Sequence, residues 1–326
     1  MIKVERKQIE GEAQHFLIVD EAEARGAVAT DVSDTYGKRA TRLTLGQHSE
    51  TIVQGIPEAW INERALEICD QKQLTKKFFS DLDIPSLKSI TYTHPSELKD
   101  QNPFDGKARF VSKPSVGGNG LGVVLNIKSY SDLCDYFESN KQHGPLFLLE
   151  EMYVGYDLRI QVINGQIIAA CRRLPAFVEG DGELTLNALI EARQCVMKTQ
   201  NPSNHIIIDQ QSLDLINAQG YSLESIIPQR LRVKLKEISN MSAGGHAIDV
   251  TDEMSSEFAP WVVKMANELQ TGYFALDLMC TDHENYSVGS AVALEINAKA
   301  EWMHHTFSEV KSHDLAKVVV DVLFGE

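Results

Sequence analysis

Cysteine is scarce in this sequence and forms no recognisable motif. The chain of 326 residues has five cysteines, an odd number, and no two of them make a Cys-x-x-Cys pair. We therefore expect neither a disulfide framework nor a structural zinc site, and the cysteine usage favours a reducing, cytoplasmic location.

Long apolar runs and basic charge are also lacking. No stretch approaches the ~18 apolar residues of a membrane span, and the first residues, MIKVERKQIEGEAQ, are too polar for a signal peptide. The chain carries 31 Lys and Arg against 46 Asp and Glu, a net charge of −15. Such an acidic chain repels phosphate backbones, so we expect no membrane and no nucleic-acid partner, while a small anion in a local basic pocket is compatible with this charge.

Several signatures of other protein classes are missing. The sequence has no internal repeat, no Walker A loop, no Gly-x-Gly-x-x-Gly loop that opens a helix, and no Gly-x-Ser-x-Gly nucleophile motif. Its composition is that of a globular protein, with 43% hydrophobic and 24% charged residues. The length predicts two or three subdomains, and the mixed strand and helix patterns predict an α/β (α+β) fold.

The first half of the chain alternates short strand and helix patterns. Strands are predicted at Phe16–Val19, Ala27–Thr30, Thr41–Leu45, Ile90–Thr93, Ala108–Lys113 and Gly122–Ile127. Helices are predicted at Ala59–Ile68 and Ser129–Asn140. Asp70 and Gln73 resemble a capping box, which predicts a further helix that starts there and ends before Pro85.

Asn164-Gly165 is the strongest turn signal, because this dipeptide favours the two-residue turn of a hairpin. The flanking segments LRIQVI and QIIAAC are then paired strands, in which Asp157 opposes Arg172 and Tyr156 opposes Arg173. This register places Arg173 at the end of the apolar face and Arg172 on the other face.

The second half begins with a polar, mostly helical stretch over residues 184–235 and a loop at Ser239–Ala247. A helix follows whose apolar residues share one face, and Gly272 is placed to end it. Two strands, YFALDLM and AVALEIN, and a last helix that carries Leu315, Val318, Val319 and Val322 complete the chain.

A glycine-rich loop follows a strand lysine in KPSVGGNGLG, at Lys113–Gly122. Glycines let backbone N–H groups approach phosphate oxygens closely, and Lys113 adds a positive charge. A flexible hairpin has the same composition, so the loop alone leaves phosphate binding open. The glycines concerned are Gly117, Gly118, Gly120 and Gly122.

Lys72 falls in the first turn of its predicted helix, where a cation opposes the helix dipole. A bound anion at this position removes the conflict. The alternative is a solvated lysine like Lys76 and Lys77, and Lys72 on its own favours that alternative.

Asp277 lies mid-strand in an apolar run, where a charge is costly unless it is paired or bound to a metal. Glu295 and Asn297 share one face of the following strand. Two carboxylates and an amide oxygen suit a hard cation such as Mg²⁺. Edge-strand polar residues in solvent are the alternative, but the apolar run around Asp277 favours the metal.

The segment LLEEMYVGYDLRI ends a strand at Glu150-Glu151 and is interrupted by Gly155. Such a hinge offers backbone groups to a base and a carboxylate to a ribose, for which Asp157 is the candidate. A cross-strand ion pair with Arg172 is the alternative role of Asp157. His304-His305 has no metal-ligand partner at a useful spacing, so we assign it no role.

In this order, the motifs resemble the ATP-grasp superfamily. The likeness is greatest to the glutathione-synthetase module of bifunctional glutamate–cysteine ligase/glutathione synthetase and to the ATP-grasp half of cyanophycin synthetase. It covers most of the chain from about Lys72 onward. Its most specific parts are QKQLTKKFF, KPSVGGNGLGV, EEMYVGYDLRIQVINGQIIAACRRLPAFVEGDGELT, SNMSAGGHAIDVTDEM and ALEIN.

The resemblance implies a fold in which a nucleotide is held between two α+β subdomains. It divides the chain into an N-terminal α/β subdomain at 1–70, a small lid subdomain at 71–148 and a catalytic subdomain at 149–326, with a helical insertion near 184–235. It also implies that ATP and Mg²⁺, with Mn²⁺ as an alternative ion, are the cofactors.

The resemblance further implies a role for particular residues. Lys72 and Lys113 bind the ATP phosphates under the glycine loop. Arg173 reaches the phosphate or acyl-phosphate and is grouped with Lys113 and Asn297 as catalytic. The metal is held by Asp277, Glu295 and Asn297, and the adenosine by Glu150, Glu151, Tyr153 and Asp157. The substrate is covered by the loop that carries Asn240, Ser242, Gly244 and Gly245.

The chain departs from the family pattern directly after the metal-binding strand. Family members often have Asn-x-Pro or Pro-Gly there and are commonly fused to a second catalytic domain, whereas this sequence reads NAKAEWMHH. Lys299 and Glu301 are candidates for binding the charged ends of a zwitterionic substrate, with Trp302 stacking on a cation. A solvent-exposed turn in which Lys299 neutralises Glu301 is the alternative.

The implied activity is that of an ATP-dependent carboxylate–amine ligase that forms an amide or peptide bond through an acyl-phosphate. Amino acids or small peptides are the implied substrates. A ligase that modifies a protein or ribosomal peptide, and a non-catalytic ATP-binding regulator, are the alternatives. The identities of donor and acceptor and the oligomeric state, including a homodimer, stay open.

Overall fold

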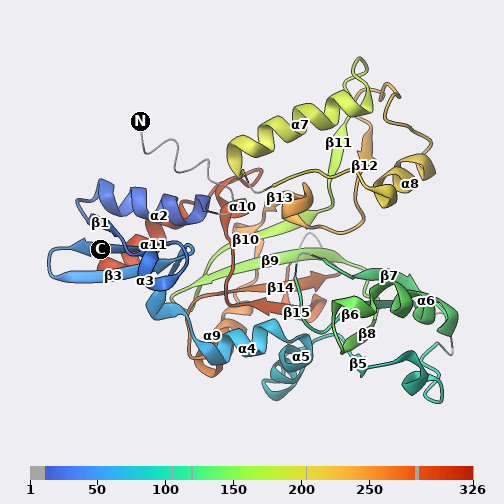
Figure 1. The fold of residues 1–326 in the computed structure, drawn as a ribbon, viewed down its shortest axis with the longest axis horizontal. Helices are drawn as coiled ribbons and strands as arrows, with labels where there is room; N and C mark the ends of the chain where they lie inside the picture. Colours follow the sequence, from blue (N-terminus) through green and yellow to red (C-terminus); the bar gives the residue numbers. More distant parts are fainter. Residues whose placement is uncertain are drawn as a thin grey trace. The chain divides into compact units, whose positions relative to one another are not determined.

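The computed structural model describes residues 12–104, 106, 108–118, 120–202, 204–282 and 286–325. The chain divides into two compact units. Unit 1 comprises Met1–Ile61, Ile168–Thr251 and Glu301–Glu326, and unit 2 comprises Asn62–Ile167 and Asp252–Ala300. Each unit has its own cluster of buried apolar residues. Figure 1 labels the helices and strands.

The N-terminal part of unit 1 is a four-stranded antiparallel sheet in the order β1-β2-β3-β4. Its strands are β1 (Val28–Asp31), β2 (Ala40–Leu45), β3 (His48–Val53) and β4 (Ile56–Pro57), with the short helix α3 (Ser33–Tyr36) between β1 and β2. Helix α2 (Ala13–Ala24) contacts β1 and β2, and helix α11 (Leu315–Phe324) packs on α2, as Figure 1 shows. The ion pair between Arg25 and Asp321, at 2.6 Å, joins the two helices.

The strand predicted at Phe16–Val19 is wrong, because these residues lie inside α2. The apolar run is flanked by Ala, Gln and Glu, which favour helix, and a short apolar run cannot be assigned by periodicity alone. Phe16, Val19 and Ala22 are buried at helical spacing. The strands predicted at Ala27–Thr30 and Thr41–Leu45 are confirmed as β1 and β2.

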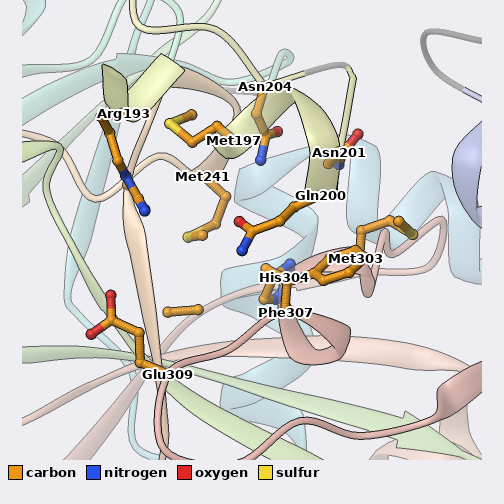
Figure 2. A pocket seen from close by; sticks show the side chains of 12 residues that line it. Arg193, Met197, Gln200, Asn201, Asn204, Met241, Met303, His304, Phe307 and Glu309 are labelled. Carbon is orange, nitrogen blue, oxygen red and sulfur yellow. The ribbon is translucent and has the colours of Figure 1, made fainter. Parts of the chain in front are cut away.

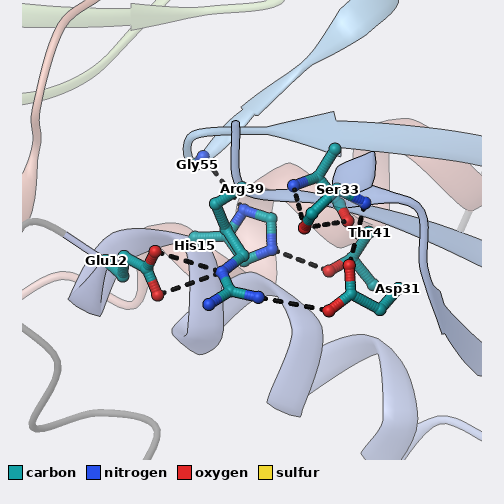
Figure 3. A network of polar contacts seen from close by, with 8 residues as sticks. Glu12, His15, Asp31, Ser33, Arg39, Thr41 and Gly55 are labelled. Carbon is teal, nitrogen blue, oxygen red and sulfur yellow. Dashed lines mark hydrogen bonds and ion pairs between the residues drawn. The ribbon is translucent and has the colours of Figure 1, made fainter. Parts of the chain in front are cut away.

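A polar network fixes α2 to this sheet (Figure 3). His15 is buried, its Nδ1 accepts the Gly55 N–H at 3.2 Å, and its Nε2 lies 2.8 Å from the Thr41 hydroxyl. Arg39 pairs with Glu12 at 3.0 Å and with Asp31 at 3.2 Å. Burial lowers the pKa of His15 to about 4, an effect that Arg39 reinforces and Asp31 opposes. The ring is therefore neutral when the unit is folded near neutral pH.

The remaining parts of unit 1 contain two further strand pairs and the predicted helical insertion. Strand β10 (Gln166–Leu174), which belongs to unit 1 from Ile168 onward, pairs antiparallel with β13 (His246–Asp249). Strand β11 (Phe177–Glu179) pairs with β12 (Arg232–Lys234). The insertion supplies helices α7 (Leu186–Gln200) and α8 (Gln210–Ala218), whose buried side chains join one cluster with β11 and β12. The loop predicted at Ser239–Ala247 is shorter than expected, since β13 begins at His246.

Unit 2 contains a four-stranded antiparallel sheet in the order β5-β8-β6-β7. Its strands are β5 (Ser89–Tyr92), β8 (Phe147–Glu151), β6 (Phe110–Pro114) and β7 (Val124–Ile127), so the predicted strands are confirmed. Helix α6 (Tyr130–Asn140) packs on β6 and β7, and the Ser129 hydroxyl caps it in a reciprocal capping box with Asp132. Leu133, Tyr136 and Phe147 lie in the buried cluster between helix and sheet.

The second sheet region of unit 2 consists of β9 (Tyr156–Ile163), β14 (Phe274–Cys280) and β15 (Ala291–Asn297), with β14 in the middle. Helices α4 (Glu63–Asp70) and α5 (Lys72–Asp81) both contact β15, and helix α9 (Phe258–Leu269) precedes β14. Asn164 and Gly165 both have positive φ, 53° and 69°, directly after β9. The predicted two-residue turn is thus confirmed.

Two predicted helix boundaries are wrong. Helix α5 begins at Lys72 after an extended Gln71 whose side chain makes no cap, because Asp70 is still the last residue of α4. Helix α9 ends at Leu269, with Gln270 in the left-handed conformation at φ 55°. Gly272 has another role, since a Cβ there would lie 2.7 Å from the backbone nitrogen of Gly165.

Helix α4 starts later than predicted. Residues Glu58–Trp60 form a 3-10 turn, and the Asn62 side chain caps α4 by accepting the Ala65 N–H at 3.1 Å.

In the described part of the chain, no helix has the length and apolar character needed to cross a membrane. The three-part division at 1–70, 71–148 and 149–326 stays a prediction.

Candidate active site

The predicted metal ligands lie on two adjacent strands of unit 2. Asp277 of β14 is paired directly with Glu295 of β15, and Asn297 is paired with Ala275 on the same two strands. The Asn297 side-chain amide donates to Asp277 Oδ2 at 3.2 Å. A register shift follows Asp277, at Asp277/Leu278. The fold therefore brings the two carboxylates and the amide together.

Sequence reasoning missed Arg159, which lies opposite Asp277 on β9. One guanidinium nitrogen of Arg159 donates to both oxygens of Asp277, at 2.9 and 3.1 Å. Both side chains are buried. The mid-strand carboxylate is thus paired, as a buried charge must be. The pairing of β9 with β14 joins residues 118 positions apart, so no local pattern could have indicated this partner.

The donor set fits a hard divalent cation. Asp277 and Glu295 offer carboxylate oxygens and Asn297 offers an amide oxygen, the ligand types that Mg²⁺ and Mn²⁺ take in proteins. Magnesium usually takes few protein carboxylates and completes its shell with phosphate and water. These three residues would hold the ion, with Arg159 fixing Asp277 from the other side.

A second cluster lies on β6, β8 and α5 of the same unit. Glu150 is buried, and its carboxylate pairs with Lys113 at 2.6 Å and with Lys76 at 3.1 Å. Burial by itself raises the pKa of Glu150, but Lys113 and Lys76 together hold it below its usual range. Glu150 is therefore an anion that fixes two ammonium groups. The sequence predicted instead that Glu150 binds adenine, which stays untested.

Lys76 corrects a prediction, because it is buried rather than solvated like Lys77. Burial lowers the pKa of Lys76 to about 8, against the opposing effect of Glu150. The signal in the sequence was its spacing, since residues four apart on a helix share a face. Lys76 follows Lys72 by four positions and is buried beside Thr75 and Phe79.

Lys72 is the first residue of α5, so it lies in the first turn of the helix as predicted, although the helix begins later than the predicted Asp70 cap. Its backbone N–H donates to Ser115 O at 2.9 Å, and its Nζ donates to Gly117 O at 2.5 Å. Burial lowers the pKa of Lys72, and the positive charge of Lys113 lowers it further. The negative charge of Glu295 opposes this shift. Lys72, Lys113, Glu150 and Glu295 therefore share one electrostatic environment.

The glycine loop extends from β6 next to these lysines. An isolated bridge between Gln71 and Val116 ties its start to α5. A Cβ at Gly117 or Gly118 would meet no atom within 4 Å, whereas one at Gly122 would lie 2.9 Å from Pro114. Gly117, Gly120 and Gly122 have positive φ. The loop is thus anchored at both ends with open space at its first glycines, and residue 119 lies outside the described residues.

The predicted adenosine-binding residues follow β8. Glu151 is exposed opposite Phe110, and Met152 N–H donates to Arg109 O at 2.7 Å. Asp157 of β9 is paired with Met279 of β14. The roles of Glu151, Tyr153 and Asp157 toward a nucleotide stay predictions.

The predicted substrate residues belong mostly to unit 1. Arg173 of β10 is paired with Ala247 of β13. The Asn240 side chain accepts hydrogen bonds from the backbone and hydroxyl of Ser242, which fixes a 3-10 turn at Met241–Ala243. Gly244 and Gly245 pack too closely for a side chain, since a Cβ would lie 2.5 Å from Ile206 and 2.9 Å from Leu174 O respectively.

The segment after β15 differs from the prediction at one residue. Trp302 is fully buried and its backbone N–H donates to Gln14 Oε1 at 2.9 Å, so it cannot stack on a substrate cation. Lys299 is exposed, and Glu301 accepts a hydrogen bond from the Asn201 amide at 2.7 Å. A substrate role for Lys299 and Glu301 stays a prediction.

The expectation that His304-His305 lacks a metal-ligand partner is wrong. Cys171 of β10 and the two histidines of helix α10 (Met303–Thr306) place their ligand atoms within 4.8 Å of one another, all buried in unit 1. Thiolate and imidazole are zinc ligands, whereas phosphoryl chemistry uses oxygen ligands. We therefore assign this cluster no part in the reaction below.

Comparison with solved structures identifies the class of fold. The chain superposes on a bifunctional glutathione synthetase from Pasteurella multocida with a TM-score of 0.71 and 21% sequence identity, over 96% of this chain and 44% of that chain. This similarity shows the fold alone. The chain has the ATP-grasp fold, as its motifs predict.

Comparison with curated proteins gives its relatives. Cyanophycin synthetase from Synechocystis sp. is 27% identical over 321 residues, which are 94% of this chain and 36% of the relative. The glutathione biosynthesis bifunctional protein of Desulfotalea psychrophila is 28% identical over 218 residues, 64% of this chain and 28% of the relative. No family model matches the chain. These similarities confirm the predicted resemblance to both groups, although the chain spans only about a third of the length of the cyanophycin synthetase.

Proposed function

We propose that this chain is an ATP- and Mg²⁺-dependent carboxylate–amine ligase. It activates a carboxylate of an amino acid or small peptide as an acyl-phosphate, which an amine then attacks to give an amide, ADP and phosphate. The similarity to cyanophycin synthetase and to the glutathione biosynthesis protein supports this class of reaction. We also propose a cytoplasmic location, as the cysteine usage predicts.

The grouping of Lys72, Lys76 and Lys113 carries this proposal. Lys72 and Lys76 share one partly buried site with Lys113, and burial together with the Lys113 charge lowers the pKa of Lys72 and of Lys76. Glu150 is the buried anion between two of them. A polyphosphate supplies the missing negative charge, which is the physical reason that lysines converge at phosphate sites.

The carboxylate and amide set supports the metal part of the proposal. Mg²⁺, when bound, neutralises the oxygens of the transferred phosphoryl group and orients them. Asp277, Glu295 and Asn297 would hold it, and Arg159 keeps Asp277 in position through two hydrogen bonds. The site is thus built on strands rather than loops, which favours accurate positioning.

Each side chain then has a task in the reaction. Lys72 and Lys113 hold phosphate oxygens, and Glu150 fixes the Lys113 ammonium at 2.6 Å. The glycine loop supplies N–H donors from Gly117 and Gly118, where no side chain blocks approach. Arg173 is proposed to contact the acyl-phosphate, as the family resemblance implies. The main contributions are positioning and charge stabilisation.

The experiment is an ADP-release assay of the purified chain with Mg·ATP against a panel of amino acids and dipeptides. We expect ADP and no AMP, and hydroxylamine should trap the activated carboxylate as a hydroxamate. Lys113→Met should abolish most of the release, while Lys77→Met, which alters an exposed lysine of the neighbouring helix, should not. Release of AMP and pyrophosphate would contradict the acyl-phosphate route.

A further inference from the structure

Unit 1 contains a pocket that the reaction described above does not use (Figure 2). Helix α7 supplies Arg193 and Gln200, the 3-10 turn after Asn240 supplies Met241, and the segment around α10 supplies Met303 and Glu309. Gly245 of the predicted substrate loop also lines it. The pocket therefore combines charged groups with thioether walls.

Arg193 is the unusual member of this pocket. Its Nε atom is buried and makes no hydrogen bond within the described residues. Burial lowers the pKa of Arg193 while Glu309 opposes the shift, so the guanidinium is held in a partly desolvated place. In the described chain no ion pair joins Arg193 directly to an acidic side chain. A partly buried guanidinium whose Nε has no partner favours an anion that can accept two hydrogen bonds.

Arg193 and Glu309 lie at the upper left and lower left of the view in Figure 2. His246 stands between them, with its Nδ1 2.9 Å from Glu309 Oε1 and 3.4 Å from Arg193 Nη2. His246 in turn stacks on Phe177 with ring centroids 3.9 Å apart. His246 is thus held by packing within reach of both opposite charges, while the Glu309 side chain is itself 56% exposed.

The charge pattern selects the class of ligand. One guanidinium and one carboxylate sum to zero, which matches a zwitterion and disfavours a polyanion such as a nucleotide, because Glu309 repels it. The amide of Gln200 points into the same space, and the methionines accept an aliphatic or polarisable side chain (Figure 2).

We infer that this pocket binds one amino acid or peptide substrate of the ligase, with Arg193 on its free carboxylate and Glu309 on its ammonium group. The inference rests on the proposed function for the identity of the ligand as a substrate. It makes Arg193 and Glu309 specificity-determining residues that the sequence did not indicate.

The test uses the full chain and isothermal titration with free amino acids and glycine-containing dipeptides, together with their carboxamide and N-acetyl analogues. Arg193→Met should weaken binding of a free carboxylate compound by about 10- to 100-fold, the contribution of a charge-assisted hydrogen bond. Arg193→Lys should recover part of the loss. The carboxamide should bind weakly to the wild type, and Arg193→Met should weaken it no further.

Glu309→Gln gives the reciprocal measurement. This substitution should weaken the binding of compounds with a free ammonium group and leave the binding of their N-acetyl analogues unchanged. Arg42→Met, which alters an exposed arginine of β2 in the same unit, is the matched control and should bind like the wild type. A loss of folding would affect all analogues alike, so the dependence on the analogue separates ligand contact from a structural role.

The outcomes distinguish the two proposals. If a compound releases ADP and Arg193→Met leaves its binding and KM unchanged, the pocket inference fails and the ligase proposal stands. If binding depends on Arg193 but no compound releases ADP, the pocket stands and the ligase proposal fails. If no compound in the panel binds the wild type, the inference is wrong.

Discussion

Lys76 and Lys77 are neighbours on helix α5, but only Lys76 is buried against Glu150. Replacing each by methionine keeps the aliphatic chain and removes the charge. Lys77 is 70% exposed and pairs with Asp81 one turn away, so Lys77→Met should change the free energy of unfolding by at most about 0.5 kcal/mol. The pair is therefore a matched test of burial and function.

Two effects oppose each other at Lys76. Losing the ion pair with the Glu150 carboxylate, at 3.1 Å, costs about 1.5–3 kcal/mol, the range for a contact with a charged group. Removing a lysine whose pKa is lowered by burial returns a similar amount, because the buried ammonium was itself unfavourable. Lys113, which pairs with Glu150 at 2.6 Å, is unchanged in the variant and still neutralises this carboxylate. We therefore expect Lys76→Met to change the free energy of unfolding by less than about 1 kcal/mol.

Nucleotide binding should respond differently. If the three lysines together bind the polyphosphate, Lys76→Met removes one of the cations that bind ATP. A loss of about 2 kcal/mol in binding free energy corresponds to a KM for ATP raised about 30-fold. Urea unfolding followed by circular dichroism measures the first quantity, and ADP release against ATP concentration measures the second. Equal KM values for the Lys76 and Lys77 variants would refute the role of Lys76. If Lys76→Met lowers the free energy of unfolding by more than about 3 kcal/mol, the two opposing effects at Lys76 do not cancel and the argument is wrong.

Three further predictions concern His15, Glu295 and Gly155. Unfolded His15 titrates near 6.5 and folded His15 near 4, so the unfolded chain binds the extra proton between these values. The free energy of unfolding should therefore fall relative to His15→Gln as the pH drops through this window, by about 3 kcal/mol at pH 4, and parallel urea-denaturation curves would contradict this. Glu295→Gln should lower kcat for Mg²⁺-dependent ADP release about 100-fold without changing the circular dichroism spectrum, and near-normal turnover would place the metal elsewhere. Gly155→Ala should cost about 1–3 kcal/mol in thermal unfolding, because its Cβ would lie 2.6 Å from Cys280 O, whereas Gly289→Ala meets no atom within 4 Å and should be neutral.

Local patterns predicted much of the fold. The Asn164-Gly165 turn, the strands that carry Asp277 and Glu295, and the helix predicted at Ser129–Asn140 are each determined by a few adjacent residues. The segment Phe16–Val19, predicted as a strand and found in helix α2, is a case that local patterns cannot decide. An apolar run of that length suits a strand or a buried helix, and the choice is made by packing of α2 against a sheet formed by later residues.

The candidate site was predictable in its residue types and not in its pairings. Lysines, a glycine loop and an acidic strand pair are visible in sequence, and all of the nucleotide and metal candidates lie in unit 2. Arg159, Lys76 and the neighbours of Cys171 depend on which strands and helices meet, over separations that no local pattern encodes. Lys76 pairs with Glu150 because it is buried, and its burial depends on the packing of α5 in the folded unit.

The division of the chain has a consequence for its synthesis. Unit 1 needs residues 301–326 as well as the N-terminal sheet, because α11 packs on α2 and Arg25 pairs with Asp321. A ribosome releases α2 almost 300 residues before α11, so the side of α2 that packs on α11 stays uncovered until the end of synthesis, even after β1 and β2 have formed. Nascent chains arrested before Leu315 should accordingly bind chaperones through α2, and the full-length chain should not.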